Sequence, residues 1–208
     1  MYDRILFLDF DGTITSEETL EGSMRLTIDS KLYEQKHKEM LSGDITLSEA
    51  LHMGFETVPS EKLSVIMDYV RNVPIRPGFS ELLTSMNQRN IPVVVISGGL
   101  KPCIDEKLAP YRNMLLGIHS VDVDSQGPYL KLISKYEEDG ELMQKTRIMA
   151  QYDYKTAICA GDSHTDFRMA GQCQTVFARD LLADLLDKAG ISYIPWKDFF
   201  EVRDYIIG

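Results

Sequence analysis

The chain has 208 residues, of which 44% are hydrophobic and 26% are charged, proportions typical of an ordinary folded domain. The length favours one domain, or one domain with a modest insertion, and the composition argues against intrinsic disorder. The formal net charge is -10 and there is no basic run, which excludes the positive surface that binding to nucleic acid requires.

The N-terminus and the cysteines indicate a compartment. The chain begins with a charged, strand-like segment rather than a basic and then apolar leader, and no apolar run approaches the ~18 residues of a membrane span. The three cysteines, Cys103, Cys159 and Cys173, are odd in number and follow no metal-ligand spacing. We therefore expect a soluble protein of the reducing cytoplasm, with no membrane partner.

Short apolar runs predict the strands. The strong runs are residues 5–8, 91–96 and 157–160, and the weaker runs are residues 175–178 and 191–194. Because the strong runs do not alternate apolar with polar residues, they predict strands buried on both faces, as in a parallel sheet between helices. Residues 118–133 do alternate, around Asp124-Ser125-Gln126-Gly127, and predict a β-hairpin.

Helical patterns separate these strands. They cover residues 78–89, 139–151, 165–171, 179–189 and 196–206. The alternation of strands and helices predicts an α/β fold with a doubly wound, mainly parallel, Rossmann-like sheet. Ligands of such sheets bind beyond the carboxyl ends of the strands, so the polar residues after each strand are the candidates for function.

Residues 16–72 interrupt this alternation. Their apolar residues recur at helical spacing, for example along Leu63 to Val70, and no convincing strand occurs among them. We predict an α/β core over residues 1–15 and 73–208, with a helical insertion at residues 16–72 after the first strand.

The segment Asp9-Phe10-Asp11-Gly12-Thr13 directly follows the first strand. In extended chain Asp9 and Asp11 project to the same side, and two carboxylates at one place are costly unless a cation neutralises them. With Mg²⁺ bound, one carboxylate can act as a nucleophile and the other can carry a proton to the leaving group. Gly12 allows a tight turn whose amides face a phosphate. The alternative is that the acids cap a helix or face solvent.

Polar segments also follow the other two strong strands. Ser97-Gly98-Gly99 offers a hydroxyl and glycine amides, which suit a phosphate-binding nest. Taken alone this segment would be a plain strand-to-helix turn, and the other signals favour the nest. In the segment from Gly161 to Asp166, Asp162 is placed to complete a metal site. Asp166, about one helical turn later, can hold a lysine or support the metal ligands, although acids here are also common helix caps.

A fixed cation is needed where a phosphoryl group and several carboxylates crowd together. Lys145, on the helix predicted after Asp139-Gly140, is our candidate. Lys135 and Lys155 also fit by composition, and the ordinary alternative is a lysine on the surface.

In order and in context, these four elements resemble the four motifs of the haloacid dehalogenase superfamily: the DxDGT loop, the Ser/Thr loop, the lysine and the GDxxxD loop. The resemblance covers nearly the whole chain. It implies a Mg²⁺-dependent phosphatase with Asp9 as the nucleophile, which forms an aspartyl-phosphate, and Asp11 as general acid and then base. It implies a cap formed by the helical insertion, metal ligands from Asp9, the Asp11 carbonyl and Asp162, support from Asp166, and phosphate contacts from Gly12, Thr13, Ser97, Gly98 and Lys145.

Within that family the chain resembles the branch whose members hydrolyse phosphoserine or an enol phosphate of methionine salvage, 2-hydroxy-3-keto-5-methylthiopentenyl-1-phosphate. Residues 9–15, 95–99, 177–180 and 198–203 favour the enol phosphate, whereas the region between Ile118 and Gly140 is shorter than in that enzyme and lacks its cysteines. Phosphoserine enzymes use a cap glutamate and a cap arginine. Glu18 matches the glutamate, but His52 stands where the arginine is expected, so phosphoserine is the alternative substrate. We expect Glu18 and His52 to contact the leaving group.

Two other functions stay open. A phospho-accepting signalling domain also places acids after its first strand, but it has no inserted cap, and Asp11 favours rapid hydrolysis over a long-lived phosphorylated signal. An inactive phosphate-binding module is disfavoured because all the chemical residues are present. An assay with p-nitrophenyl phosphate and Mg²⁺ separates these functions from a phosphatase.

Overall fold

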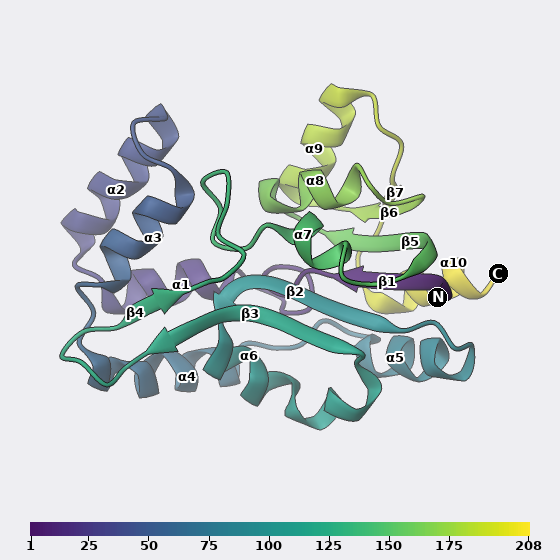
Figure 1. Cartoon of the computed structure of the whole chain (residues 1–208), viewed down its shortest axis with the longest axis horizontal. Coiled ribbons are helices and arrows are strands. Elements are labelled where there is room, and N and C mark those ends of the chain that lie inside the picture. The colour runs from purple at the N-terminus through teal and green to yellow at the C-terminus, as the bar shows by residue number, and fades with distance from the viewer.

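The computed structural model describes all 208 residues. Its strands form one sheet in the order β4-β3-β2-β1-β5-β6-β7 (Figure 1). The strands are β1 (Tyr2–Leu8), β2 (Val93–Leu100), β3 (Gly117–Asp124), β4 (Lys131–Ile133), β5 (Tyr154–Gly161), β6 (Thr175–Ala178) and β7 (Ile194–Pro195). Every neighbouring pair is parallel except β3 and β4. The predicted α/β fold is confirmed, and so is the predicted hairpin, formed by β3 and β4.

β1 lies at the centre of the sheet, between β2 and β5. Its residues Ile5 to Leu8 are all fully buried. Successive side chains of a strand point to opposite faces, so an unbroken apolar run needs cover on both. Leu8 pairs with Val95 of β2 and with Ala160 of β5, which brings the carboxyl ends of the three central strands to one edge.

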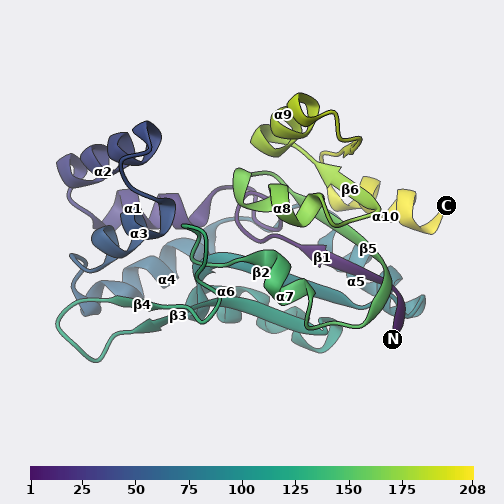
Figure 2. The ribbon, with the colours of Figure 1, turned by 45° about the horizontal axis from the view of Figure 1, so that its top comes forward.

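Helices provide that cover on both faces of the sheet (Figures 1 and 2). On one face lie α5 (Phe79–Gln88), α6 (Lys101–Leu108) and α10 (Phe199–Ile207), and on the other lie α7 (Lys145–Met149), α8 (Phe167–Ala170) and α9 (Asp180–Ala189). Short 3₁₀ helices are η1 (Ser60–Lys62), η2 (Ala109–Met114) and η3 (His164–Asp166). The predicted doubly wound arrangement, with helices on both faces of the sheet, is thus present. None of the helices is long and apolar enough to cross a membrane.

The helical insertion (residues 16–72) contains helices and no strand. Its helices are α1 (Thr19–Thr27), α2 (Ser30–Ser42), α3 (Leu47–Phe55) and α4 (Leu63–Asn72). Local signals set their ends: Asp29 caps α2, Gly43 ends it in the left-handed conformation, and Thr46 and Glu49 form a capping box on α3. α2 stands away from the sheet, α3 packs against β4, and α4 packs beside α6 (Figure 1).

Several helices and strands begin or end at other residues than the sequence predicts. The helix expected over residues 139–151 covers only Lys145–Met149. Asp139 (φ 53°) and Gly140 (φ 79°) have left-handed backbone that no right-handed helix can include, and Gln144, in extended backbone, is the N-cap. The helix expected over residues 196–206 begins at Phe199, where Asp198 caps it. The strand expected over residues 191–194 is reduced to Ile194–Pro195.

The strand expected to end at Ile96 continues to Leu100. The segment Ser97-Gly98-Gly99 therefore lies inside β2 rather than in a turn after it. Pairing with β3 shifts register between Ile96 and Leu100, an irregularity of the kind that redirects side chains near functional sites.

Candidate active site

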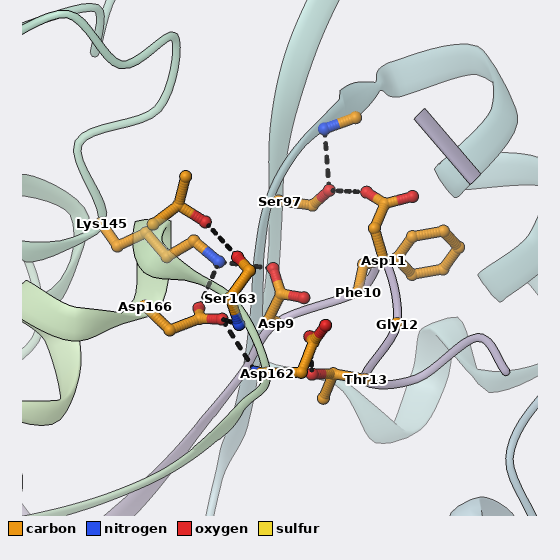
Figure 3. Close-up of polar contacts among 12 residues, drawn as sticks. Asp9, Phe10, Asp11, Gly12, Thr13, Ser97, Lys145, Asp162, Ser163 and Asp166 are labelled. Carbon is orange, nitrogen blue, oxygen red and sulfur yellow. Dashed lines mark hydrogen bonds and ion pairs between the residues drawn. The ribbon is translucent and has the colours of Figure 1, made fainter. Parts of the chain in front are cut away.

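The acidic and hydroxyl side chains predicted to carry chemistry meet at the carboxyl edge of the three central strands (Figure 3). Asp9 follows β1, Ser97 lies near the end of β2, and Asp162 follows β5. Asp9 extends the strand pairing, since its amide donates to the Ala160 carbonyl at 3.1 Å. Asp9 is 5% exposed and Asp162 is 6% exposed, so the carboxylates are almost completely withdrawn from water.

Lys145, the first residue of α7, enters this group of acids as a buried cation. Its ammonium donates to Asp166 Oδ1 at 2.7 Å and also to Asp9 Oδ1 (Figure 3). Burial opposes the charge, but the Asp166 and Asp9 carboxylates hold the pKa of Lys145 above its ordinary value. Lys145 therefore stays charged, and neither Lys135 nor Lys155 belongs to this group.

Asp166 connects this lysine to the turn after β5. Its Oδ2 accepts from the amides of Asp162 and Ser163, both at 3.1 Å, while its Oδ1 accepts from Lys145. Both oxygens of this fully buried carboxylate are thus engaged within the protein.

Asp162 is held from the other side by the turn after β1. The Thr13 hydroxyl donates to Asp162 Oδ1 at 2.7 Å. Gly12 has a φ of 71°, and any side chain there would collide with Asp162 and with Glu18, so this close approach requires glycine. Burial and the charge of Asp166 raise the pKa of Asp162 to about 6.

The Asp11 carboxylate turns toward the helical insertion. It accepts from the Thr19 hydroxyl, from the Leu20 amide at 3.2 Å and from the Ser97 hydroxyl at 3.0 Å. Ser97 in turn accepts from the Gly99 amide at 2.8 Å. Burial raises the pKa of Asp11, which favours the protonated form that a general acid needs.

The donor set fits a hard divalent cation. Oxygen atoms of Asp9, Asp162 and Asp166 lie within 4.8 Å of one another. Since both oxygens of Asp166 are engaged, Asp9 and Asp162 are the side chains left to bind Mg²⁺, which prefers such ligands. The Asp11 side chain is not in this group, because its carboxylate accepts hydrogen bonds from Thr19, Leu20 and Ser97. Burial raises the pKa of Asp9, a cost that a bound cation would remove.

A cavity of about 630 Å³ lies between this site and helices α1 to α3. The predicted site residues that line it are Asp9, Asp11, Glu18, Gly98, Lys145 and Asp162. Three others, Gly12, Thr13 and Ser97, are among the predicted phosphate contacts but do not line it. The Thr13 and Ser97 hydroxyls instead donate to Asp162 and Asp11.

Glu18 and His52 were both expected at the leaving group, but the structure separates them. Glu18 lines the cavity, and burial together with the charges of Asp162 and Asp11 raises the pKa of Glu18 to about 10. His52 does not line the cavity, since its Nε2 pairs with Glu137 Oε2 at 3.1 Å. The structure thus places His52 outside the cavity, with its ring paired to a carboxylate of the loop before α7.

Sequence reasoning missed part of the cavity wall. Glu141, Leu142 and Met143 precede Lys145 and line the cavity from the core side. They lie within the helix that the sequence predicts over residues 139–151. The sequence feature that indicates a turn before these residues is the dipeptide Asp139-Gly140, since Asp-Gly is typical of turns and ends helices.

Comparisons with known proteins agree with this geometry. Residues 6–171 match the family model described as haloacid dehalogenase-like hydrolase. A 2-hydroxy-3-keto-5-methylthiopentenyl-1-phosphate phosphatase from Microcystis aeruginosa is 38% identical over 206 residues, 98% of each chain. A protein of the same name from Exiguobacterium sibiricum is 28% identical, over 98% of this chain and 95% of the relative. A solved phosphoserine phosphatase from T. onnurineus has a TM-score of 0.70 at 19% identity, covering 99% of this chain and 94% of that one, a likeness of fold.

Proposed function

Because the chain belongs to the haloacid dehalogenase-like hydrolase family and is a phosphatase, we propose that it hydrolyses a small phosphorylated metabolite with an apolar tail. Our specific candidate is 2-hydroxy-3-keto-5-methylthiopentenyl-1-phosphate, the compound for which the two relatives described above are named. We propose Mg²⁺ as the cofactor and an aspartyl-phosphate on Asp9 as the intermediate.

The residues that line the cavity favour a substrate with an apolar tail. Its lining includes apolar side chains from both the insertion and the core, three of them methionines: Leu20, Met24, Met40, Leu51, Leu142 and Met143. A thioether or alkyl tail suits such a wall, because methionine side chains adapt to irregular apolar groups.

The cations of the cavity argue in the same direction. No arginine lines it. The insertion contributes Lys36, which already pairs with Glu39 at 2.8 Å, and His37. The carboxylate of phosphoserine would call for a dedicated cation, most effectively an arginine fork.

In the proposed reaction Asp9 is the nucleophile and Asp11 is the general acid and then the general base. A carboxylate oxygen of Asp9 attacks phosphorus, the ester P–O bond breaks, and the Asp11 carboxyl gives its proton to the leaving oxygen. Asp11 then takes a proton from water, which attacks the phosphorus of the aspartyl-phosphate and releases inorganic phosphate. Lys145 holds the Asp9 carboxylate and balances charge on the phosphoryl oxygens. The Gly98 backbone, which lines the cavity, is a further contact for these oxygens.

Mg²⁺ bound by Asp9, Asp162 and the Asp11 carbonyl would supply charge neutralisation at the phosphoryl group. Thr19, Leu20 and Ser97 orient Asp11 through the hydrogen bonds that they donate to it. Two of these donors, Thr19 and Leu20, belong to the start of α1. We propose that residues 16–72 act as a cap, since this insertion supplies both the wall around the leaving group and partners of the general acid.

The experiment that tests this function is a substrate comparison. Purified protein with Mg²⁺ is assayed on the enol phosphate, on phosphoserine and on p-nitrophenyl phosphate. We expect kcat/KM on the enol phosphate to exceed that on phosphoserine by about 100-fold, since an unmatched buried charge costs about that much in discrimination. A preference for phosphoserine would support the second candidate, which Glu18 in the cavity wall favours as a partner for an amine.

A further inference from the structure

The two chain segments that connect the core with the helical insertion run side by side. Thr15 and Ile75 form an antiparallel bridge. The Ser16 amide donates to the Pro74 carbonyl at 3.0 Å, and the Arg76 amide donates to the Ile14 carbonyl at 2.8 Å. Arg76 therefore stands where the returning segment re-enters the core, directly beside the turn that follows Asp9 and Asp11.

The Arg76 guanidinium binds the backbone of that turn. Its Nε donates to the Thr13 carbonyl at 3.0 Å, and its Nη2 donates to the Gly12 carbonyl at 2.6 Å and, at a longer 3.4 Å, to the Thr15 carbonyl. A rigid fork of donors can hold two peptide groups at a fixed spacing, which a lysine ammonium cannot do as well.

The same guanidinium is anchored to the core. It lies 5.4 Å from the ring centroid of Trp196, which is buried and packs against Phe199 with ring centroids 5.1 Å apart. Arg179 lies 5.5 Å from the same Trp196 centroid. Arg179 thus shares the aromatic partner of Arg76, but it donates to Asp180 and to the Lys197 carbonyl rather than to the turn after β1.

The turn itself is closed by its own hydrogen bonds. The Thr15 amide donates to the Phe10 carbonyl at 2.9 Å, and the Gly12 amide donates to the Glu17 carbonyl at 3.0 Å. Loss of Arg76 would therefore leave the turn folded but less firmly attached to the core. The Thr13 hydroxyl, which holds Asp162, and the Asp11 carbonyl would move with it.

We infer that Arg76 is a positioning residue for the phosphatase reaction: by clamping the carbonyls of Gly12 and Thr13 to the core, it holds Asp11 and Asp162 at the spacing that the metal and the phosphoryl group require. The expected change in kcat rests on the proposed function, whereas the expected change in Mg²⁺ affinity does not. Arg76 is remote from the leaving group, so its effect is the same for every substrate.

The test compares Arg76→Ala and Arg76→Lys with Arg179→Ala in the full chain. For Arg76→Ala we expect kcat on p-nitrophenyl phosphate to fall about 10- to 100-fold, the usual cost of misplaced catalytic groups. We expect Mg²⁺ affinity, measured by calorimetry without substrate, to fall about 3- to 10-fold, in keeping with the loss of ligand support. Arg76→Lys should recover part of both losses, and Arg179→Ala should stay within about twofold of wild type in both.

Trp196 is the single tryptophan, so its fluorescence reports on both arginines. Arg76→Ala and Arg179→Ala should each change the emission, because both arginines lie over the Trp196 ring. Only Arg76→Ala should also lower kcat and Mg²⁺ affinity, because only Arg76 binds the turn after β1. If folded Arg76→Ala matches Arg179→Ala in kcat and in Mg²⁺ affinity, Arg76 only supports the fold and the inference is wrong. Should Arg76→Ala be insoluble, Arg76→Lys decides, and wild-type values in both measurements would overturn the clamp. If wild type hydrolyses no phosphomonoester, the proposed function fails, and calorimetry still tests Arg76.

Discussion

Asp166 holds Lys145 with one carboxylate oxygen, at 2.7 Å, and the turn of Asp162 with the other. Because both residues are buried, neither charge has water to replace its partner. Asp166 thus links the cation of the site to a metal ligand, although it contacts neither the metal nor the substrate in the proposed mechanism.

We expect Asp166→Asn to lower kcat on p-nitrophenyl phosphate by at least about 10-fold, because an amide has one acceptor oxygen and must turn its NH₂ donor either toward Lys145 or toward the amides of Asp162 and Ser163. The free energy of unfolding should fall by about 1–3 kcal/mol, as for a buried group that loses a charged partner. Kinetics and denaturant unfolding of the same preparation measure the two effects. Asp139→Asn is the matched control, since its pair with Arg168 is exposed. Equal losses in both variants would mean that Asp166 has no special role.

The Asp9 carboxylate is the proposed nucleophile, and Asp9→Asn tests it. An amide keeps the size of the side chain but is a poor nucleophile, so we expect kcat below about 1% of wild type with the circular dichroism spectrum unchanged. Asp11→Asn, which keeps the nucleophile, should accumulate labelled protein after exposure to ³²P-phosphorylated substrate, whereas Asp9→Asn should not. Label on Asp9→Asn would contradict a covalent intermediate at this residue.

The central strands and the site acids could be predicted because their signals are local. Ile5 to Leu8 is an unbroken apolar run, and the acids follow it directly along the chain. The wall of the cavity could not be predicted in the same way. His52 pairs with Glu137 and Met143 faces the cavity because of contacts between segments far apart in sequence, and neither contact leaves a local pattern. Arg76 was missed for the same reason, since its acceptors are backbone carbonyls, which every residue has.

The buried carboxylates of the site call for a cation beyond Lys145. We expect exhaustive treatment with EDTA to reduce activity to below about 1% and added Mg²⁺ to restore it, because Asp9 and Asp162 offer hard oxygen ligands. Ca²⁺ is the control, since it prefers more ligands at longer distances and should restore activity poorly. Full activity in the chelated protein would show that these acids have another role.

His119 offers a test of stability against pH outside the active site. Burial, together with the charges of Lys135 and Lys101, lowers the pKa of His119, whose ring bonds to the Tyr152 hydroxyl at 2.7 Å. A group with a lowered pKa stabilises the fold at pH above its ordinary value of about 6.5, and this contribution is lost as pH falls through the lowered pKa. His119→Gln should therefore lose less stability than wild type between pH 7.5 and 5. An identical loss of stability with falling pH in both proteins, measured by chemical denaturation, would contradict a lowered pKa of the half-buried His119.

The last prediction concerns Glu18, the acidic residue that the helical insertion places in the cavity just before α1. A carboxyl there can exchange hydrogen bonds with hydroxyl or amine groups of a leaving group, and losing such a contact costs about 1–3 kcal/mol. That range corresponds to about 5- to 150-fold in kcat/KM. We expect Glu18→Ala to lower kcat/KM on the natural substrate by this factor and to spare p-nitrophenyl phosphate, which offers no such group.

His52→Ala is the matched control for Glu18→Ala, because His52 belongs to the same insertion but pairs with Glu137 outside the cavity. It should change neither substrate by more than about twofold, as for a half-exposed pair. Glu18 and Asp162 both lie against Gly12. An equal loss on both substrates in Glu18→Ala would therefore mean that Glu18 supports Asp162 rather than binding the leaving group. If neither substrate responds, Glu18 takes no part in recognition, and the apolar wall of the cavity alone selects the substrate.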